Sequence, residues 1–133
     1  MNKQSRTQLT RETKEAFQRY QAAITIDRKK DQADERVVEY ASEIIKELPG
    51  NLMKPEVEVL ESGVIVLTWL VQNDLEYNIA ALYINDRGYM HLCMNCGEFA
   101  GHILAWTVDR LHETMEALIA RLEPYFFKNH SPK

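Results

Sequence analysis

The sequence predicts an α+β fold, in which an antiparallel meander of four strands, or five, is flanked by N-terminal helices and a C-terminal helix. No glycine or proline occurs before Pro49, which favours helix over the first 48 residues. Between Val57 and Met94, short runs rich in β-branched and aromatic residues alternate with turn residues, as in successive hairpins. A helical apolar stripe returns after Thr107 and predicts a last helix.

Size and composition are those of one globular domain, with 133 residues, of which 45% are apolar and 27% charged. The first residues are polar, so no signal peptide is expected, and the two cysteines then indicate a reducing, cytoplasmic location. Net charge is −4, but residues 1–30 hold eight Lys or Arg against three Asp or Glu. We therefore divide the chain into an N-terminal helical arm, 1–30, and a single α+β domain, 31–133.

Two helices are expected in the N-terminal third. The first carries a thin apolar stripe at helical spacing, with Ser5, Thr7 and Thr10 as possible N-caps. The stripe ends in the charged run 27–31, which indicates a break, although one continuous exposed helix also fits. Asp34 can cap a second helix that ends at Pro49-Gly50. The stripe of the first helix consists of Leu9, Phe17, Tyr20 and Ile24.

Turn residues predict the hairpin registers. Residues 85–88, Asn-Asp-Arg-Gly, have the signature of a type I turn followed by a glycine bulge. Residues 73–74 and 62–63 fit two-residue hairpin loops. A slip of one residue would exchange the two faces of a strand. The expected cross-strand pairs are Tyr83 with His91, Ala81 with Cys93, Leu70 with Tyr77, Thr68 with Ile79, and Val59 with Val66.

With these registers both faces of the sheet are apolar, and a sheet of this kind has to be covered on both sides. The drier face is the expected core: Leu60, Ile65, Leu67, Trp69, Val71, Ala80, Leu82, Ile84, Met90, Leu92 and Met94. The second face adds polar tips: Val57, Val59, Val64, Val66, Thr68, Leu70, Tyr77, Ile79, Ala81, Tyr83, Tyr89, His91 and Cys93. Either the first helix covers this second face or another protein does.

The C-terminal third is less regular at its start. Residues 96–106 fit a short fifth strand or a half-turn packed on the sheet. The last helix is expected to begin near Thr107 or Asp109 and to stop at Pro124. The aromatic tail 125–127 is expected to dock on some other surface, which the sequence does not identify.

The clearest chemical motif is Cys93-x-x-Cys96-Gly97, which His91 and His102 flank. These four side chains could supply the ligands of a zinc knuckle. However, Cys96 would point away from Cys93 if the strand continued to residue 96, and no second ligand pair is present. Buried free thiols are the plainer interpretation, so no cofactor is expected. A redox pair would need a helix start directly after the motif.

Catalytic constellations are missing from the sequence, which holds neither a nucleophile elbow nor a glycine-rich phosphate loop, and we predict no enzyme. The basic arm raises a nucleic-acid hypothesis, but basic and aromatic residues do not alternate in it. An arm that folds back on its own acidic body or on a second copy is favoured, and no membrane contact is expected.

We predict a small, soluble protein-binding module that acts as an inhibitor, adaptor or chaperone-like accessory protein, as a homodimer. The element order is loosely similar, in shape alone, to that of secretion-chaperone-like folds, which bind proteins as dimers. A zinc-binding protein and a nucleic-acid-associated protein are the alternatives. The expected contact residues lie on the second face and the first helix: Val66, Thr68, Ile79, Tyr83, Tyr89, His91, Phe17 and Tyr20.

Overall fold

The computed structural model describes residues 1–24, 33–96, 99–107 and 111–127, and these form three helices and a five-stranded sheet. The sheet is an antiparallel meander in the order β1-β2-β3-β4-β5, so the α+β prediction is confirmed and the fifth strand is present. The elements, in chain order, are α1 (Lys3–Ala23), α2 (Arg36–Glu47), β1 (Glu56–Val59), β2 (Ile65–Gln72), β3 (Tyr77–Ile84), β4 (Tyr89–Cys96), β5 (Phe99–Thr107) and α3 (Leu111–Phe126).

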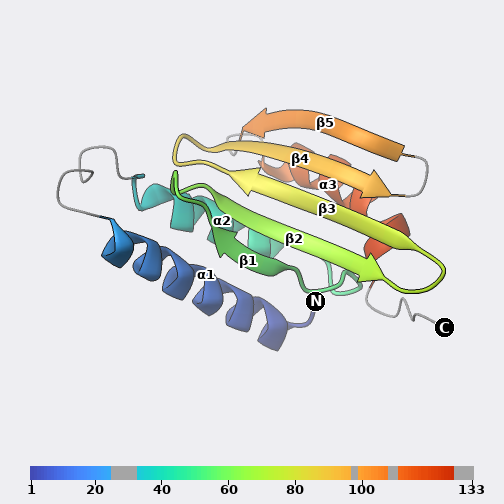
Figure 1. Ribbon diagram of the computed structural model, residues 1–133, viewed down its shortest axis with the longest axis horizontal. Coiled ribbons are helices and arrows are strands. Elements are labelled where there is room, and N and C mark those ends of the chain that lie inside the picture. The colour runs from blue at the N-terminus through green and yellow to red at the C-terminus, as the bar shows by residue number, and fades with distance from the viewer. Residues whose placement is uncertain (25–32, 97–98, 108–110, 128–133) are drawn as a thin grey trace.

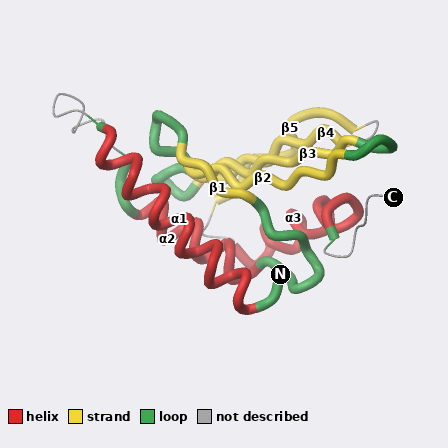
Figure 2. Tube along the Cα trace, turned by 60° about the horizontal axis from the view of Figure 1, so that its bottom comes forward, coloured by secondary structure: helices red, strands yellow, loops and turns green. Residues whose placement is uncertain are grey.

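All three helices lie on one side of the sheet, and α1 runs beside the edge strand β1 and against α2 (Figures 1 and 2). The two N-terminal helices are separate, because α1 ends at Ala23 and α2 begins at Arg36. The charged run 27–31 lies outside the described residues. Asn2, rather than a predicted serine or threonine, caps α1, and its Oδ1 accepts the Ser5 amide N–H at 2.8 Å.

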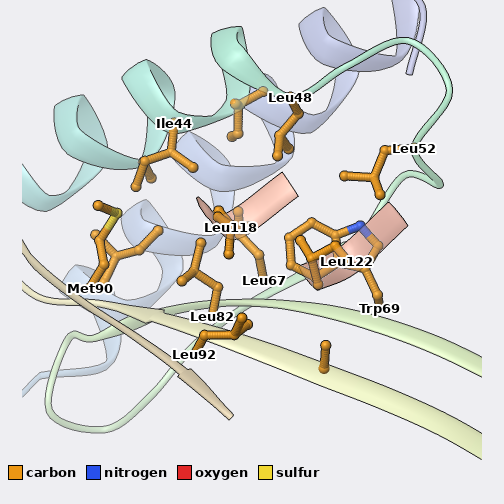
Figure 3. Close-up of a cluster of buried hydrophobic side chains, with 14 of the residues drawn as sticks. Ile44, Leu48, Leu52, Leu67, Trp69, Leu82, Met90, Leu92, Leu118 and Leu122 are labelled. Carbon is orange, nitrogen blue, oxygen red and sulfur yellow. The ribbon is translucent and has the colours of Figure 1, made fainter. Parts of the chain in front are cut away.

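The core is one cluster between the helices and the inner face of the sheet (Figure 3). It joins Ile44 of α2 and Leu48, the C-cap of that helix, to Leu118 and Leu122 of α3, all fully buried. Each such side chain contributes roughly 1.5–3 kcal/mol to stability. Leu9 of α1 belongs to the same cluster. Helix α1 is therefore packed into the domain and does not cover the second face of the sheet.

The register of the β3–β4 hairpin is as predicted, with Tyr83 opposite His91 and Ala81 opposite Cys93. The β2–β3 loop is longer than predicted, because Asn73 Oδ1 accepts the amide N–H groups of Leu75 and Glu76 and closes a four-residue loop. The register is shifted by two residues, which leaves the faces unchanged. The pairs are therefore Leu70 with Ile79, Thr68 with Ala81, and Gln72 with Tyr77.

The first hairpin departs from its prediction by one residue, so the predicted faces of β1 are wrong. Val59 pairs with Ile65, because the loop is wider than predicted. The Leu60 N–H donates a hydrogen bond to the Val64 carbonyl oxygen at 2.9 Å. Gly63 turns this loop with a φ of +87°, and a Cβ there would lie 2.3 Å from the Ala33 Cβ. Val57 and Val59 consequently pack against the core, and the glutamates of β1 take the opposite face.

The C-terminal region also differs from expectation. Thr107 ends β5 instead of starting the helix, and residues 108–110 lie outside the described residues. Helix α3 continues past Pro124 to Phe126, since a proline in the last turn removes one hydrogen bond without ending the helix at once. The aromatic tail docks as predicted: Phe126 is fully buried and its carbonyl accepts the Met53 amide N–H at 2.7 Å.

Candidate functional site

The candidate site is the face of β2, β3 and β4 that points away from the helices, called the outer face below. Because strand residues alternate, the side chains between the core positions point outward. Within the described residues no helix lies over this face (Figure 2). Leu70, Tyr77 and Tyr89 are 43%, 49% and 52% exposed there. The outer face comprises Val66, Thr68, Leu70, Gln72, Tyr77, Ile79, Ala81, Tyr83, Tyr89, His91, Cys93 and Asn95.

The centre of the outer face is a cross-strand row formed by Val66, Tyr83 and His91. The rings of Tyr83 and His91 stack in a tilted arrangement, with centroids 6.3 Å apart and planes at 42°. Val66 is only 5% exposed because its cross-strand neighbours, Glu58 and Tyr83, are larger. The row therefore combines a buried aliphatic base with two half-buried rings that keep polar atoms.

No Asp, Glu, Lys or Arg is present among the outward residues of β2, β3 and β4. The charges begin at the margin, where Glu56 lies opposite Thr68 and Glu58 lies opposite Val66. The predicted register had placed valines at this margin. The observed register of the first hairpin, one residue from the predicted one, thus gives the outer face an acidic border beside an uncharged centre.

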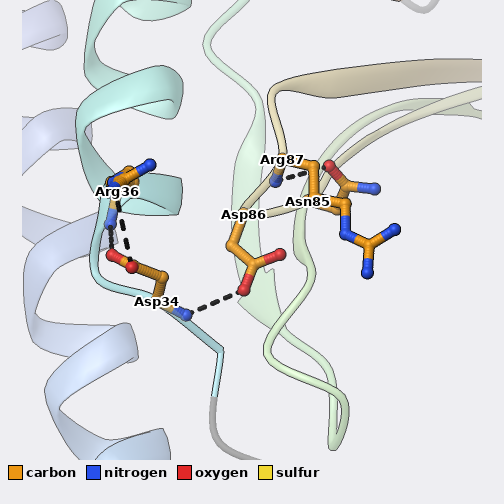
Figure 4. Close-up of polar contacts among 5 residues, drawn as sticks. All are labelled: Asp34, Arg36, Asn85, Asp86 and Arg87. Atoms are coloured by element: carbon orange, nitrogen blue, oxygen red, sulfur yellow. Dashed lines mark hydrogen bonds and ion pairs between the residues drawn. The ribbon is translucent and has the colours of Figure 1, made fainter.

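Polar contacts attach the β3–β4 hairpin, which carries Tyr83 and His91, to the start of α2 (Figure 4). Asp86 Oδ2 accepts the backbone N–H of Asp34 at 2.9 Å, and Asp34 Oδ1 accepts the Arg36 N–H at 2.9 Å. Asn85 Oδ1 accepts the backbone N–H of Arg87 at 3.0 Å and closes the turn. The exposed Arg36–Asp34 ion pair, at 3.8 Å, contributes little by itself. Asp34 caps α2 by this side-chain contact, although Glu35 holds the N-cap position.

The expected contact residues fall into two groups. Val66, Thr68, Ile79, Tyr83, Tyr89 and His91 all lie on the outer face. Phe17 does not belong with them, because it is 2% exposed within the core. Tyr20 is half-buried, its hydroxyl accepts the Ala33 N–H at 3.1 Å, and its side chain lines a groove between α1 and β1. Of the two aromatic residues expected as contacts on the first helix, Phe17 lies in the core and Tyr20 stays partly accessible.

Leu70 and Tyr77 are the most exposed apolar residues of β2 and β3, and we did not select them as contact residues from the sequence. Alternation had assigned both to the second face. Their exposure depends on their position near the β2–β3 loop, which a residue pattern does not report. They extend the candidate surface away from the Tyr83–His91 pair.

The two cysteines lie on opposite faces, because β4 continues to Cys96. Cys96 is 1% exposed on the inner face, and its thiol lies 3.6 Å from the Ile79 carbonyl oxygen. Cys93 is half-buried on the outer face, and the register sets His102 of β5 opposite it. Among the described residues, no three His, Cys, Asp or Glu side chains group closely enough to hold a metal ion.

Burial raises the pKa of the Cys93 thiol, and it raises that of Cys96 against the smaller opposing effect of backbone hydrogen bonds. Both thiols are therefore protonated to a greater extent at neutral pH than an ordinary cysteine. Reactive or redox-active cysteines have the opposite property, a lowered thiol pKa. The arrangement is that of two structural thiols, each on a different side of the sheet.

Helix α1 separates two surfaces of opposite charge. On the side toward α2, a shallow hollow of about 550 Å³ is lined by cations and threonines, among them Lys3, Arg11 and Lys14. On the side toward β1, Glu12 and Glu15 line the surface, and Glu12 pairs with Lys54 at 2.6 Å. The excess positive charge of residues 1–30 that the described part contains is thus concentrated on one side of α1.

No helix of the described residues is long and apolar enough to cross a membrane. Comparisons with protein-family models, with curated proteins and with solved structures found no match. The surfaces described above are therefore the basis for assigning a function.

Proposed function

We propose that this chain is a protein-binding module without catalytic activity, and that its outer face binds a second copy of the same chain. The observation that carries the proposal is that no described helix lies over the outer face: Leu70, Tyr77 and Tyr89 are about half exposed there, on strands whose inner side chains are buried. Contiguous apolar surface of this kind marks contact sites in soluble proteins.

The size of the face is that of the central part of a protein interface. Strands β2, β3 and β4 have eight residues each. At a rise of ~3.3 Å per residue and a spacing of ~4.8 Å between strands, these three strands measure about 26 by 14 Å, or about 370 Å² in projection. Side chains increase the accessible area above the projected area. A standard interface buries roughly 800 Å² per partner, so the outer face supplies about half of that area in projection.

The charge pattern supports a second copy as the partner. The chain carries a net charge of −4, so two copies repel each other across most surfaces. The centre of the outer face carries no charged side chain, and there two copies can meet without this repulsion. Tyrosine, threonine and histidine also suit an interface that is exposed in the free chain, because each combines apolar area with a polar tip.

The test is the molar mass in solution of a matched pair of variants, Leu70→Glu and Leu75→Glu. Leu70 lies on the outer face, whereas Leu75 is 79% exposed in the β2–β3 loop, outside that face. In a twofold interface Leu70→Glu introduces two carboxylates, and we expect dimerisation to weaken ~100-fold or more. Leu75→Glu is expected to leave it unchanged. A wild-type chain that is monomeric at all concentrations would contradict the proposal.

A second candidate is anion binding by the basic side of α1, including nucleic acid. Lys3, Arg11 and Lys14 form no ion pair with another described residue. The measurement is fluorescence anisotropy of a labelled single-stranded RNA at increasing salt, with Arg11→Glu compared with Arg87→Glu in the distant β3–β4 turn. Specific loss in Arg11→Glu and a steep salt dependence would support this candidate, and equal effects of both variants would exclude it.

A further inference from the structure

A groove of about 720 Å³ lies between α1 and β1, and it is separate from the centre of the outer face. One wall is the helix, through Ala16, Arg19 and Ala23. The other wall is the edge strand, through Val57 and Glu58. Ala16 and Ala23, seven residues apart on this wall, leave space beside the strand, while the larger Arg19 and Tyr20 also line the groove.

Among the described residues, no strand pairs with the edge of β1 that faces the groove. β1 is the first strand in the sheet order, and β2 is its ladder partner among the described residues. An edge strand presents alternate backbone N–H and C=O groups that an added strand can pair with. A groove between an edge strand and a neighbouring helix is the setting in which peptides bind by adding a strand to a sheet.

The charge of the groove selects the chemistry of the peptide. A second hollow of about 470 Å³ continues the groove along the same helix and strand, and it shares Arg19 and Val57 with the first. Five carboxylates and two cationic side chains line the two hollows along the described residues, which is a formal charge of −3. The lining charges are those of Glu12, Glu15, Glu56, Glu58 and Glu61 against Arg19 and Lys54.

We propose that the groove binds an extended basic segment of another protein, which pairs with β1 as an additional strand. Alternate side chains of an added strand point to opposite faces of the sheet. One set then lies against the apolar side of the groove, with Ala16 and Val59, and prefers small or branched apolar residues. The other set lies beside Glu56 and Glu58 and prefers lysine or arginine. The recognised pattern is therefore alternating apolar and basic.

The acidic edge of β1 also disfavours pairing with the same edge of a second copy. An edge strand of one copy could pair with the same edge of another, which leads to aggregation. Here such pairing would set glutamates against glutamates across the new ladder, and like charges directly opposite each other are destabilising. The acidic edge thus disfavours a second copy while it favours a basic strand.

The experiment uses the full chain and three capped hexapeptides: alternating Lys-Val, alternating Glu-Val, and the Lys-Val peptide with every second backbone nitrogen methylated. We expect the Lys-Val peptide to bind with a dissociation constant in the micromolar range and to perturb the NMR amide signals of Glu56–Val59. N-methylation removes ladder hydrogen bonds, so binding should weaken about tenfold or more. The Glu-Val peptide should not bind measurably.

A matched pair of variants locates the site. Ala23→Trp fills the groove, whereas Ala22→Trp places the same side chain on an adjacent exposed position that does not line it. Binding should be lost in Ala23→Trp and kept in Ala22→Trp. Glu58→Lys should weaken it about tenfold, and the exposed Glu47→Lys on α2 should not. Equal binding by both tryptophan variants, or amide perturbations confined to the outer face, would overturn the proposal. Their molar masses should match the wild type, which keeps this result independent of dimerisation.

Discussion

The two faces of the sheet are formed by the same three strands, yet their environments differ completely. Inner residues of β2, β3 and β4 are all 6% exposed or less, beneath three helices. Outer residues range from the buried Val66 to the half-exposed Tyr89. The inner face uses Leu, Ile, Met and Trp, whereas the outer face uses Tyr, Thr and His at similar positions. The difference shows that an apolar pattern identifies a face, while the polar tips indicate which face is exposed in the free chain.

The largest contrast is expected from the same substitution on the two faces of β2. Leu67→Glu places a carboxylate in the fully buried core, and a loss of about 4 kcal/mol or more of unfolding free energy is expected. Leu70→Glu places it on the half-exposed outer face and should change that free energy by less than about 1 kcal/mol. Urea denaturation of dilute protein measures both. Equal destabilisation would show that the outer face is also core.

Truncation to alanine gives a smaller contrast. Leu92→Ala removes a fully buried inner side chain and should cost about 2–5 kcal/mol, because it leaves a cavity. Tyr77→Ala, on the exposed part of the outer face, should cost less than about 1 kcal/mol in the monomer. The measurement is thermal unfolding at two protein concentrations. In the wild type, the midpoint temperature should rise with protein concentration because the dimer stabilises the folded chain. In Tyr77→Ala this rise should be smaller, an effect that a purely structural role of Tyr77 would not produce.

Gly63 sets the register that assigns β1 to its faces. Gly63→Ala combines a strained positive φ with a Cβ 2.3 Å from the Ala33 Cβ and 2.8 Å from the Tyr20 hydroxyl oxygen. We expect a loss of roughly 1–3 kcal/mol by calorimetry. A matched substitution, Gly50→Ala, meets only the Met1 carbonyl oxygen at 3.5 Å and should cost less. Equal stability of the two variants would contradict the close approach of Gly63 to Ala33 and Tyr20.

The smallest effect concerns thiol reactivity. Iodoacetamide should modify Cys93 in the native chain and leave Cys96, on the inner face, unmodified until unfolding. Because burial raises the pKa of the Cys93 thiol, the rate of its modification should be low at neutral pH. The rate should still be increasing with pH at values above the ordinary thiol pKa. Dilution should accelerate the reaction as dimers dissociate. Mass spectrometry of the two peptides measures it, and faster modification of Cys96 would reverse the assignment of faces.

Much of this architecture could be predicted because it depends on local patterns. The Asn-Asp-Arg-Gly turn specified the β3–β4 register, and alternation then assigned Ile79, Tyr83 and His91 to the outer face. The first hairpin could not be predicted in the same way. Its loop width depends on the approach of Gly63 to Ala33 and Tyr20, which are distant in sequence. Because the predicted register was wrong by one residue, neither the acidic margin nor the groove beside β1 could be predicted.

The position of α1 also could not be predicted from the sequence pattern. A thin apolar stripe left open whether this helix or another protein covers the second face. The packing partners of α1, which show that it does not, are α2 and β1. Phe17 consequently changed from a candidate contact residue to a core residue, while the exposure of Leu70 became evident only from the structure.

Sedimentation velocity of the wild-type chain, Leu70→Glu and Leu75→Glu over a wide concentration range tests the central claim most directly. The account predicts that the wild type and Leu75→Glu sediment as a species of twice the 15.5 kDa chain mass at high concentration. It predicts that Leu70→Glu remains a folded monomer under the same conditions. A wild type that stays monomeric, or a Leu70→Glu variant that dimerises as well as Leu75→Glu, would contradict the assignment of the outer face to a second copy.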